Sequence, residues 1–303
     1  MFLRTAVAVV AAGAFLGVHA AVDGITVSRV IFVCVGVFTI AMLERWRPVA
    51  SFLLPAILLV AAYDIHGFFV PRFFPRTVYV GELRDWELAW FGIATPAGEI
   101  TPAAWFQTHT LPLLDLLCGL AYLGFYPIFL LLAAWWRFGR RRADAQLVTW
   151  AMLWLHLAGY VAHLAFPAPA PWYVDHYGVG PAVLTAPGEA SGAARFDELV
   201  GIPWFSNSYP NAVNIFGACP SLHVGLTFLA VLFAFRFRSL RVVAVTYWAL
   251  VTLASVYLNH HYIVDGLTGM VFAAGVYSLV AMKLNRPADR LPGNTDQVLE
   301  KAG

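Results

Sequence analysis

Cys219-Pro220-Ser221-Leu222-His223 opens an apolar run that continues to residue 236. A second stretch, His260-His261-Tyr262-Ile263-Val264-Asp265, leads into another apolar run that ends near residue 282. In both stretches, ionisable side chains stand at the edge of a segment that is suited to a membrane interior. Ionisable groups at such positions cost free energy and are retained where they serve a function. The two stretches therefore predict a membrane-embedded fold together with its functional site.

The composition agrees with a membrane protein. Of the 303 residues, 60% are hydrophobic and only 12% are charged, whereas soluble domains carry about 25% charged residues. The formal net charge is +2, which gives no indication of a nucleic-acid partner. The three cysteines, Cys34, Cys118 and Cys219, have no paired spacing, which argues against a disulfide framework or a zinc site. Cys219 is either a small apolar residue beside a helix start or a reactive thiol.

A membrane-spanning helix needs about 20 mostly apolar residues. Eight segments fit this requirement to a first approximation and predict an all-α, polytopic membrane helical bundle. They are residues 5–22, 28–43, 49–70, 111–136, 146–166, 220–236, 241–258 and 262–282. Residues 71–110 and 167–219 are longer, more polar connections. We divide the chain into extra N-terminal helices (1–48), a catalytic domain (49–283) and a disordered cytoplasmic tail (284–303).

The basic residues predict how the bundle is oriented. Strict alternation of eight spans puts 14 of the 19 Lys and Arg residues on one side, and these concentrate in the short loops that decide orientation. Both termini are therefore predicted to be cytoplasmic, with loops 71–110 and 167–219 and the turn at Asn259 outside. Residues 1–20 are read as a retained helix; a signal peptide cleaved after Val18-His19-Ala20 is the alternative and leaves the other spans unchanged.

The outer loop 71–110 is rich in aromatic residues. Trp86, Trp90, Phe91, Trp105 and Phe106 alternate with acidic and basic side chains. Amphipathic aromatic residues settle at the membrane–water interface. The loop is therefore predicted to contain an interfacial helix, with an ordinary exposed loop as the alternative.

Three polar residues at the outer ends of the last spans suggest a reaction centre. His261 and Asp265 are four residues apart, which on a helix puts them on one face. The carboxylate can then hold one ring nitrogen and leave the other free to attack. His223 follows Pro220-Ser221, a helix-start signal whose exposed N–H groups suit a phosphate. One histidine as nucleophile and one as proton donor would serve phosphoryl transfer; the alternative is two interfacial histidines in structural hydrogen bonds.

These residues carry a family resemblance. Pro220-Ser221-Leu222-His223 and His261-Tyr262-Ile263-Val264-Asp265 resemble the second and third signature blocks of the type-2 phosphatidic acid phosphatase superfamily. The longer stretches Phe216 to Gly225 and Tyr257 to Asp265 are most similar to its inositol phosphorylceramide synthase branch. The motifs are specific but short, about 20 residues, and their order extends the resemblance over the C-terminal half.

The resemblance implies a six-helix catalytic core and a role for each residue. His261 would form a phosphohistidine, Asp265 would orient it, and His223 would protonate the leaving group and then deprotonate the incoming hydroxyl. Ser221 and nearby backbone amides would hold the phosphoryl oxygens. His260 matches the doubled histidine of the branch, but successive helical residues are about 100° apart, so it is expected to point elsewhere.

The chain lacks the basic residues of the superfamily's signature blocks. The first block, K-x6-R-P, is absent: Arg47-Pro48 and Arg286-Pro287 lack the upstream basic residue and lie on the cytoplasmic side. The arginine of the third block is replaced by Ser255. Since phosphoryl transfer needs positive charge against the developing negative charge, Arg72 and Arg76 are the predicted substitutes. Their alternative role is to anchor to lipid head groups.

Other polar residues within the spans are weaker candidates. Asp64 and His66 lie two apart in the third span, so they cannot share a face, but either could line the site. Asp115, at the outer start of the fourth span, could line the site as well. His156 and His163 share a face of the fifth span and could in principle bind haem; packing or hydrogen bonding is the preferred interpretation.

We therefore predict an integral enzyme of a bacterial plasma membrane, with its site on the extracytoplasmic side. It would move a phospho-head group, possibly phosphoinositol, from a phospholipid donor to a lipid or sugar hydroxyl, without a metal or another cofactor. One alternative is a phosphatase acting on a lipid phosphate or a polyprenyl pyrophosphate. A second, of a different class, is a non-enzymatic transporter or a haem-binding membrane protein.

Overall fold

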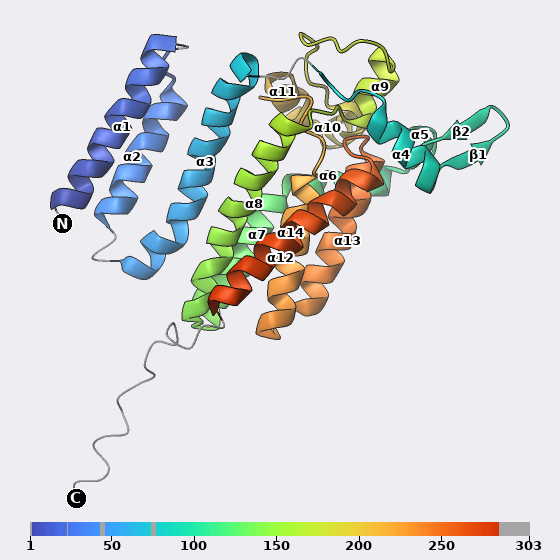
Figure 1. The fold of residues 1–303 in the computed structure, drawn as a ribbon. Helices are drawn as coiled ribbons and strands as arrows, with labels where there is room; N and C mark the ends of the chain where they lie inside the picture. The colour runs from blue at the N-terminus through green and yellow to red at the C-terminus, as the bar shows by residue number, and fades with distance from the viewer. Residues whose placement is uncertain (1, 23, 43–45, 74–76, 285–303) are drawn as a thin grey trace, which may run out of the picture.

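The computed structural model describes residues 2–22, 24–42, 46–73 and 77–284, which form fourteen α-helices and one small hairpin (Figure 1). The N-terminal half contains α1 (Phe2–Val22), α2 (Val27–Ala41), α3 (Arg47–Phe73), α4 (Glu82–Phe91), β1 (Ile93–Thr95), β2 (Gly98–Ile100), α5 (Pro102–Thr108), α6 (Pro112–Leu123) and α7 (Phe125–Ala134). The C-terminal half contains α8 (Gln146–Ala165), α9 (Pro171–Tyr177), α10 (Ala194–Val200), α11 (Trp204–Ser208), α12 (Leu222–Phe237), α13 (Arg241–Tyr257) and α14 (Ile263–Leu284). The predicted tail lies outside the described residues, apart from Leu284, the last residue of α14.

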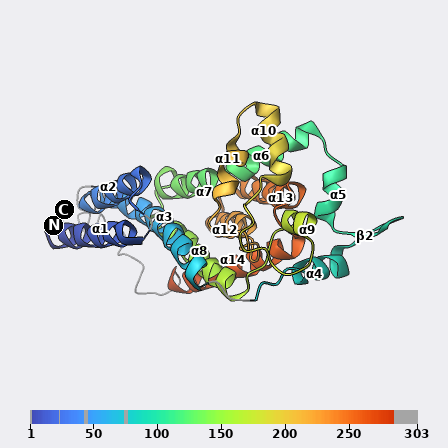
Figure 2. The same cartoon turned by 90° about the horizontal axis from the view of Figure 1, so that it is seen from above.

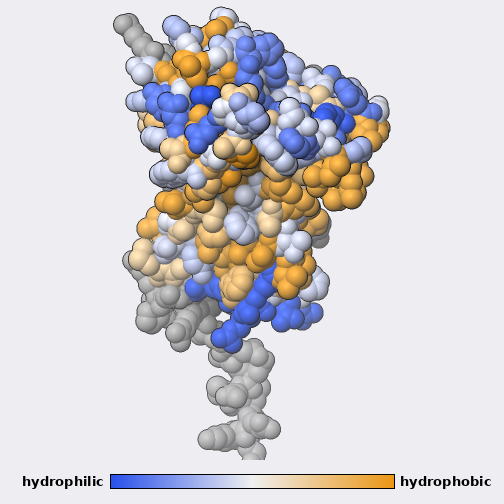
Figure 3. Space-filling view, turned by 90° about the vertical axis from the view of Figure 1, so that its right-hand side faces the viewer, coloured by the Kyte–Doolittle hydropathy of each residue, from blue (hydrophilic) through white to orange (hydrophobic). Residues whose placement is uncertain are grey.

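Each predicted span corresponds to a helix or a pair of helices. Three segments are long and apolar enough to cross a membrane by themselves: Arg47–Gly67, Ala143–Ala165 and Ile263–Lys283. A bent pair, α6 with α7, passes the same test jointly, and four shorter apolar helices lie within α1, α2, α12 and α13. Hydrophobic residues gather in a band across the middle of the bundle, with hydrophilic residues above and below it (Figure 3). The predicted all-α membrane bundle is thus confirmed.

The fourth predicted span, 111–136, is not one straight helix. It consists of α6 and the helical segment Phe125–Gly139, which meet at Gly124 with a bend of 57°. Pro127 explains the break, because it has no N–H to donate to the carbonyl of Leu123 and its ring crowds that carbonyl. The last turn of the segment, Trp135–Gly139, is π-helical.

The helices alternate in direction as the predicted topology requires. The start of α1 and the end of α14 lie at the same end of the bundle (Figure 1). The two long connections gather at the opposite end, where α4, α5, α9, α10 and α11 cover the spans (Figure 1). The functional candidates in the motifs therefore lie beneath a layer made by the two loops.

Helix α12 occupies the centre of the bundle and packs against α7, α8, α13 and α14 (Figure 2). Its crossing with α14 is close because glycine faces glycine: a Cβ on Gly269 would lie 2.2 Å from the Ser221 carbonyl oxygen, and one on Gly225 would lie 2.8 Å from that of Gly269. Small residues permit such approach between membrane helices, where packing rather than water exclusion drives association. Helices α1 and α2 pack together beside α3, which in turn packs on α8.

The aromatic loop is helical, as predicted, but it also contains a hairpin that the sequence analysis did not anticipate. Helix α4 buries Leu83 and Glu87 and leaves Trp86 and Trp90 47% and 69% exposed. Strands β1 and β2 pair antiparallel, and Gly98, the first residue of β2 after the turn, has a φ of +119°. This left-handed backbone conformation favours glycine. The exposed tryptophans suit an interfacial position of α4.

Candidate active site

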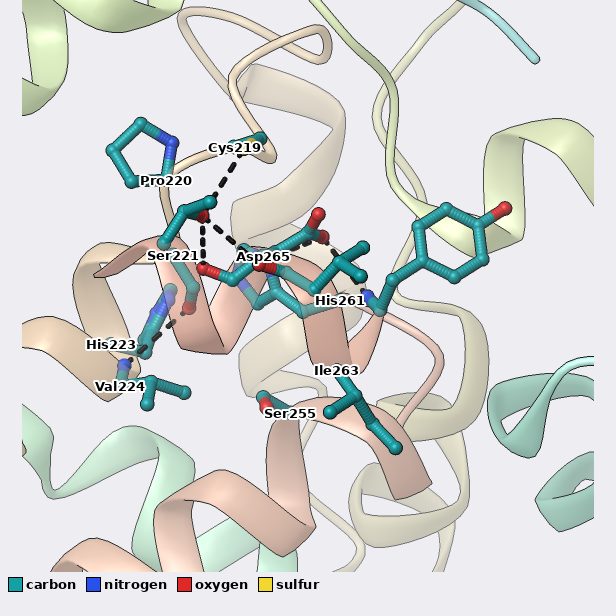
Figure 4. A network of polar contacts seen from close by, with 12 residues as sticks. Cys219, Pro220, Ser221, His223, Val224, Ser255, His261, Ile263 and Asp265 are labelled. Atoms are coloured by element: carbon teal, nitrogen blue, oxygen red, sulfur yellow. Dashed lines mark hydrogen bonds and ion pairs between the residues drawn. The ribbon is translucent and has the colours of Figure 1, made fainter. Parts of the chain in front are cut away.

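His261 and Asp265 pair, although not on one helical face as predicted. His261 precedes α14, and Asp265 occupies the first turn of that helix. The His261 Nδ1–H donates to Asp265 Oδ2 over 3.3 Å, and the backbone N–H of Tyr262 donates to the same oxygen over 2.9 Å (Figure 4). Asp265 therefore caps the start of its own helix while it orients the histidine. This pairing leaves Nε2 of His261 as the nitrogen with a free lone pair.

Glu87, which the sequence analysis did not single out, completes the start of α14. Its carboxylate is fully buried and accepts the N–H groups of Ile263 at 3.0 Å and Val264 at 3.1 Å. These N–H groups have no partner within a helix, since they belong to its first turn. Burial raises the pKa of the Glu87 carboxyl from 4.5 to about 7, although the two N–H groups favour its ionised form. The outer helix α4 is thereby joined to the turn that carries His261.

His223 lies in the first turn of α12 and is held by Tyr122 of α6, another residue that the sequence did not indicate. The Tyr122 hydroxyl and the His223 Nδ1 are 3.1 Å apart, and the two rings stack with their centroids 4.1 Å apart. The ring centroids of His223 and His261 are 5.6 Å apart. The structure thus brings both histidines and Asp265 together, with a separate hydrogen-bond partner for each ring.

The motif that precedes α12 is anchored to α14 and α8. The Ser221 N–H donates to the Asp265 carbonyl oxygen at 2.9 Å, and its side chain, fully buried, accepts the Val224 N–H at 3.4 Å (Figure 4). His163 of α8 contacts the Pro220 carbonyl through Nε2 at 3.0 Å. Ser221 is therefore the N-cap of α12; its predicted contact with phosphoryl oxygens remains a prediction.

The two histidines line a cavity of about 720 Å³ between α3, α7, α8 and α12. Apolar side chains, among them Leu59, Leu130 and Leu222, form much of its wall. No Lys or Arg of the described residues is part of this wall. A cavity of this size and character suits the hydrocarbon and linker of a lipid whose polar end reaches the histidines.

The remaining binding candidates separate into two groups. His66 lines the cavity together with His223 and His261. Asp64 lies elsewhere, because its carboxylate pairs with Arg29 at 3.2 Å and with His19 at 2.7 Å; the site prediction for Asp64 is not supported by this geometry. Arg72 belongs to α3, but its side chain and all of Arg76 lie outside the described residues.

His260 is buried and is not among the residues that line the cavity; its predicted contact with substrate remains a prediction. Its ring stacks on Tyr209 and Tyr122, with centroids 4.3 Å and 5.5 Å apart. Burial lowers the pKa of His260 to about 3, and the nearby His261 acts in the same direction. His260 is therefore a neutral member of an aromatic stack that extends through Tyr122 to His223.

The weaker candidates have structural partners. Both nitrogens of His156 are engaged, with the Met152 carbonyl at 2.8 Å and the Tyr126 hydroxyl at 2.7 Å, which leaves neither for a haem iron. Asp115 accepts from Arg195 at 2.6 Å and from the Tyr257 hydroxyl at 2.8 Å. Cys219 is buried 3.2 Å from the Thr268 hydroxyl, and burial raises the pKa of its thiol to about 12. A thiol with this pKa is a poor nucleophile.

Comparison with known proteins agrees with this site. The chain is 29% identical to the phosphoinositol dihydroceramide synthase of Bacteroides thetaiotaomicron over 234 residues, 74% of each chain. It is 34% identical to the inositol phosphorylceramide synthase of Candida albicans over 58% of this chain and 38% of that protein. For the inositol phosphorylceramide synthase catalytic subunit of Saccharomyces cerevisiae, identity is 35% over 41% of this chain and 31% of that protein.

The matched region thus spans about three quarters of the bacterial relative and about a third of the two fungal ones. No solved structure matches the chain significantly. The profile described as the PAP2 superfamily matches residues 97–279, which include both motifs, Tyr122 and α6 to α13. Since this match covers more than half of the sequence, the chain belongs to the PAP2 superfamily.

Proposed function

We propose that this protein is a membrane lipid phosphotransferase that moves a phosphoinositol head group from a phospholipid to the hydroxyl of a second lipid. The observation that carries this proposal is the position of His223 and His261 in one largely apolar cavity, each with its own hydrogen-bond partner. The relatives, whose names describe phosphoinositol and ceramide products, support the same reaction class. Their substrates suggest the donor and acceptor to test first.

The first half of the reaction forms a covalent intermediate. Nε2 of His261 attacks the phosphorus, a P–N bond forms, and the bond from phosphorus to the glycerol oxygen of the donor breaks. His223 gives its proton to that leaving oxygen, so that diacylglycerol departs neutral. The Asp265 carboxylate stabilises the positive charge that His261 acquires, because it accepts the Nδ1–H.

The second half reverses these steps with a new alcohol. His223, now neutral, takes the proton of the acceptor hydroxyl, and the oxygen attacks phosphorus as the P–N bond breaks. The head group is thereby transferred and both histidines return to their starting state. An apolar cavity favours a lipid alcohol over water as the acceptor, because a bound lipid displaces water from the histidines.

The developing negative charge on the phosphoryl oxygens needs cations. Arg72, and Arg76 just beyond the end of α3, are the proposed source, since α3 forms one wall of the cavity and runs toward the outer end of the bundle. Loss of either arginine is expected to lower kcat more than it changes donor binding, because the charge is greatest in the transition state.

The site is proposed to face the extracytoplasmic side of a bacterial plasma membrane. His223 is in the first turn of α12 and His261 directly precedes α14. Both helices start toward the end of the bundle where the two long loops gather, opposite the start of α1 and the end of α14 (Figure 1). Arg137, Arg140, Arg141 and Arg142 follow the far end of α7, and such clusters remain on the cytoplasmic side.

Lipid mass spectrometry tests the proposal. Purified protein is incubated with isotopically labelled phosphatidylinositol, phosphatidate or a polyprenyl pyrophosphate, each with mixed lipid alcohols. We expect a new labelled phosphodiester lipid and diacylglycerol from phosphatidylinositol only, and neither from a His261→Ala variant. Release of free phosphate or free phosphoinositol without any acceptor product would identify a hydrolase and contradict the transferase proposal.

The matched control is His109→Ala. His109 is an exposed histidine outside the cavity, stacked on Trp105 with ring centroids 3.9 Å apart. Retained activity in this variant, together with loss in His261→Ala, would attribute the effect to the site. Thermal unfolding of both variants shows whether each is folded.

A further inference from the structure

The turn that carries His261 is held from two sides. On the α13 side, the His261 N–H donates to the Ser255 carbonyl oxygen at 2.9 Å. On the α14 side, the N–H groups of Ile263 and Val264 donate to the Glu87 carboxylate of α4 at 3.0 and 3.1 Å. The first contact comes from the helix that leads into the turn, whereas the second comes from the outer layer, 176 and 177 positions away in the sequence. The position of His261 therefore depends on where α4 lies.

The inner face of α4 is joined closely to the start of α14. Leu83 and Glu87, four residues apart, are the buried residues of α4. Leu83 belongs to the same apolar cluster as Tyr262 and Val264, the residues that follow His261. In two perpendicular views, α4 lies at the periphery of the bundle, beside the outer end of α14 (Figures 1 and 2). A displacement of α4 would therefore move the first turn of α14.

The outward side of α4 carries two tryptophans. Trp86 and Trp90 are four residues apart, which on a helix puts them on one face, and they are 47% and 69% exposed. Hydrophobic residues are exposed just below the hydrophilic outer layer on the side of the molecule that carries α4 (Figure 3). At the lipid–water interface, an indole ring buries its apolar body and keeps its N–H hydrated. The head-group level of the outer leaflet is therefore the surface that fits this face of α4.

We propose that α4 is a membrane-contact element that positions the nucleophile. Trp86 and Trp90 fix the helix in the lipid–water interface of the outer leaflet, and Glu87 transmits the position of the helix to the turn that carries His261. This inference rests on the proposed function, in which His261 attacks phosphorus on the extracytoplasmic side. Glu87 is a positioning residue, because it bonds to the backbone beside His261 and is not part of the cavity wall. A loosened turn lowers turnover more than substrate binding, since attack requires close alignment of the reacting atoms.

Two substitutions interrupt this coupling at separate points. Glu87→Gln keeps the shape of the side chain, but its amide N–H2 group cannot accept, so the N–H of Ile263 or of Val264 loses its partner. Trp90→Ala removes the more exposed ring of the membrane contact and leaves Glu87 in place. Trp154→Ala is the matched control, because it removes a tryptophan that is 55% exposed on α8 and is not among the residues that line the cavity.

The first experiment measures kcat and KM in nanodiscs, with phosphatidylinositol as donor and a lipid alcohol as acceptor. We expect kcat to fall about tenfold in Glu87→Gln, as for the loss of one hydrogen bond, and to fall in Trp90→Ala as well. The KM for phosphatidylinositol should change little in either variant, because the cavity is intact. Trp154→Ala should keep both constants. A wild-type kcat in either α4 variant, or a loss that appears mainly in KM, would overturn the proposal.

Hydrogen exchange separates this inference from the proposed function, because it needs no turnover. The proteins exchange in nanodiscs, and peptides that cover residues 261–266 and 241–254 are followed by mass spectrometry. We expect faster exchange over 261–266 in Glu87→Gln and in Trp90→Ala, and no change over 241–254 of α13. This result supports the coupling even if the wild type transfers nothing. Unchanged exchange over 261–266 in Trp90→Ala overturns the coupling even if the wild type proves to be a phosphoinositol transferase, and so does an equal acceleration in both peptides, which would indicate general unfolding.

Discussion

At the scale of single residues, the site depends on how each histidine ring is held. Asp265 holds His261, and Tyr122 holds His223 through a 3.1 Å hydrogen bond and a ring stack. The Tyr122 hydroxyl bonds to Nδ1, which leaves Nε2 of His223 for proton transfer. Tyr122 is therefore a positioning residue for the proposed acid and base.

Tyr122→Phe tests this role, because it removes the hydroxyl and keeps the stack. We expect kcat to fall about tenfold, which corresponds to the loss of one hydrogen bond to the ring, and the pH profile of kcat to move. Tyr79→Phe is the control, since Tyr79 stacks on Phe166 in the outer layer. A Tyr122→Phe enzyme with the wild-type pH profile and kcat would show that the contact is only structural.

The sequence predicts some of these residues and not others, for a physical reason. His223, His261 and Asp265 stand beside helix starts, where an ionisable group at a membrane edge is unusual enough to be noticed. Tyr122 lies 101 positions from His223, and Glu87 lies 176 positions from Ile263. No sequence spacing predicts such contacts, because only the packing of α4 and α6 brings Glu87 and Tyr122 to the site. Asp64 is the reverse case: it is an ionisable residue in a span, it pairs with Arg29 and His19, and its predicted contact with the substrate remains a prediction.

At the scale of helices, the α12–α14 crossing sets the distance between the two motifs. Gly269 lies four residues after Asp265, and a Cβ there would lie 2.2 Å from the Ser221 carbonyl oxygen. Backbone atoms in the crossing cannot move aside as a flexible side chain does, so the helices must separate. The hydrogen bond from Ser221 to the Asp265 carbonyl would then be strained or lost.

We therefore expect Gly269→Ala to reduce activity by about 100-fold or more, through displacement of His223 from His261, and to lower the thermal unfolding midpoint. Gly275→Ala on the same helix is the control, because a Cβ there meets nothing within 4 Å. Activity and the unfolding midpoint are measured for both in detergent. Similar activity and unfolding midpoints for the two variants would contradict the importance of the close approach between α12 and α14 at Gly269.

The outer helix α4 contributes to the site through Glu87, whose carboxylate caps α14. Because burial raises the pKa of Glu87 from 4.5 to about 7, the folded protein binds this proton more tightly than the unfolded chain does. The stability that Glu87 contributes is thus fully present below pH 4.5 and declines as the pH rises through 7. Glutamine at this position has no such proton to lose.

The free energy of unfolding of the wild type, relative to Glu87→Gln, should therefore fall between pH 4.5 and 7, by on the order of 1 kcal/mol or more. Denaturant unfolding in detergent at several pH values measures this difference. A difference that stays constant over this pH range would contradict the shifted pKa of Glu87.

At the scale of the whole molecule, sequence patterns were sufficient to predict an all-α membrane bundle and the apolar segments that form its helices. The eight apolar segments and their alternation followed from length and hydropathy, since the bilayer leaves few alternatives to a helix. The 57° bend at Gly124 was not predicted from the sequence, because a proline in a span can be accommodated with or without a sharp bend. The hairpin of β1 and β2 was not predicted either. Loop 71–110 was predicted to contain an interfacial helix and loop 167–219 only as a polar connection, and the outer layer that the two loops form together was not predicted.

The proposed orientation can be tested with alkaline phosphatase fusions, which are active only outside the cytoplasm. A fusion after Arg142 should be inactive, and a fusion after Gly180, in the loop beyond α9, should be active. Fusions of green fluorescent protein at the same positions should give the opposite signals. The reverse pattern in both sets would put the histidines on the cytoplasmic side.

The central claim is that His261 carries the head group during transfer, and trapping this intermediate tests it most directly. The protein is mixed with phosphatidylinositol labelled in the inositol ring, quenched in alkali without an acceptor, and digested for peptide mass spectrometry. We expect inositol phosphate on the peptide that contains His261, its loss on addition of a lipid alcohol, and its absence from His261→Gln. If the wild type forms product in the same preparation while His261 remains unmodified at all quench times, or if His261→Gln still transfers the head group, the histidine mechanism is contradicted.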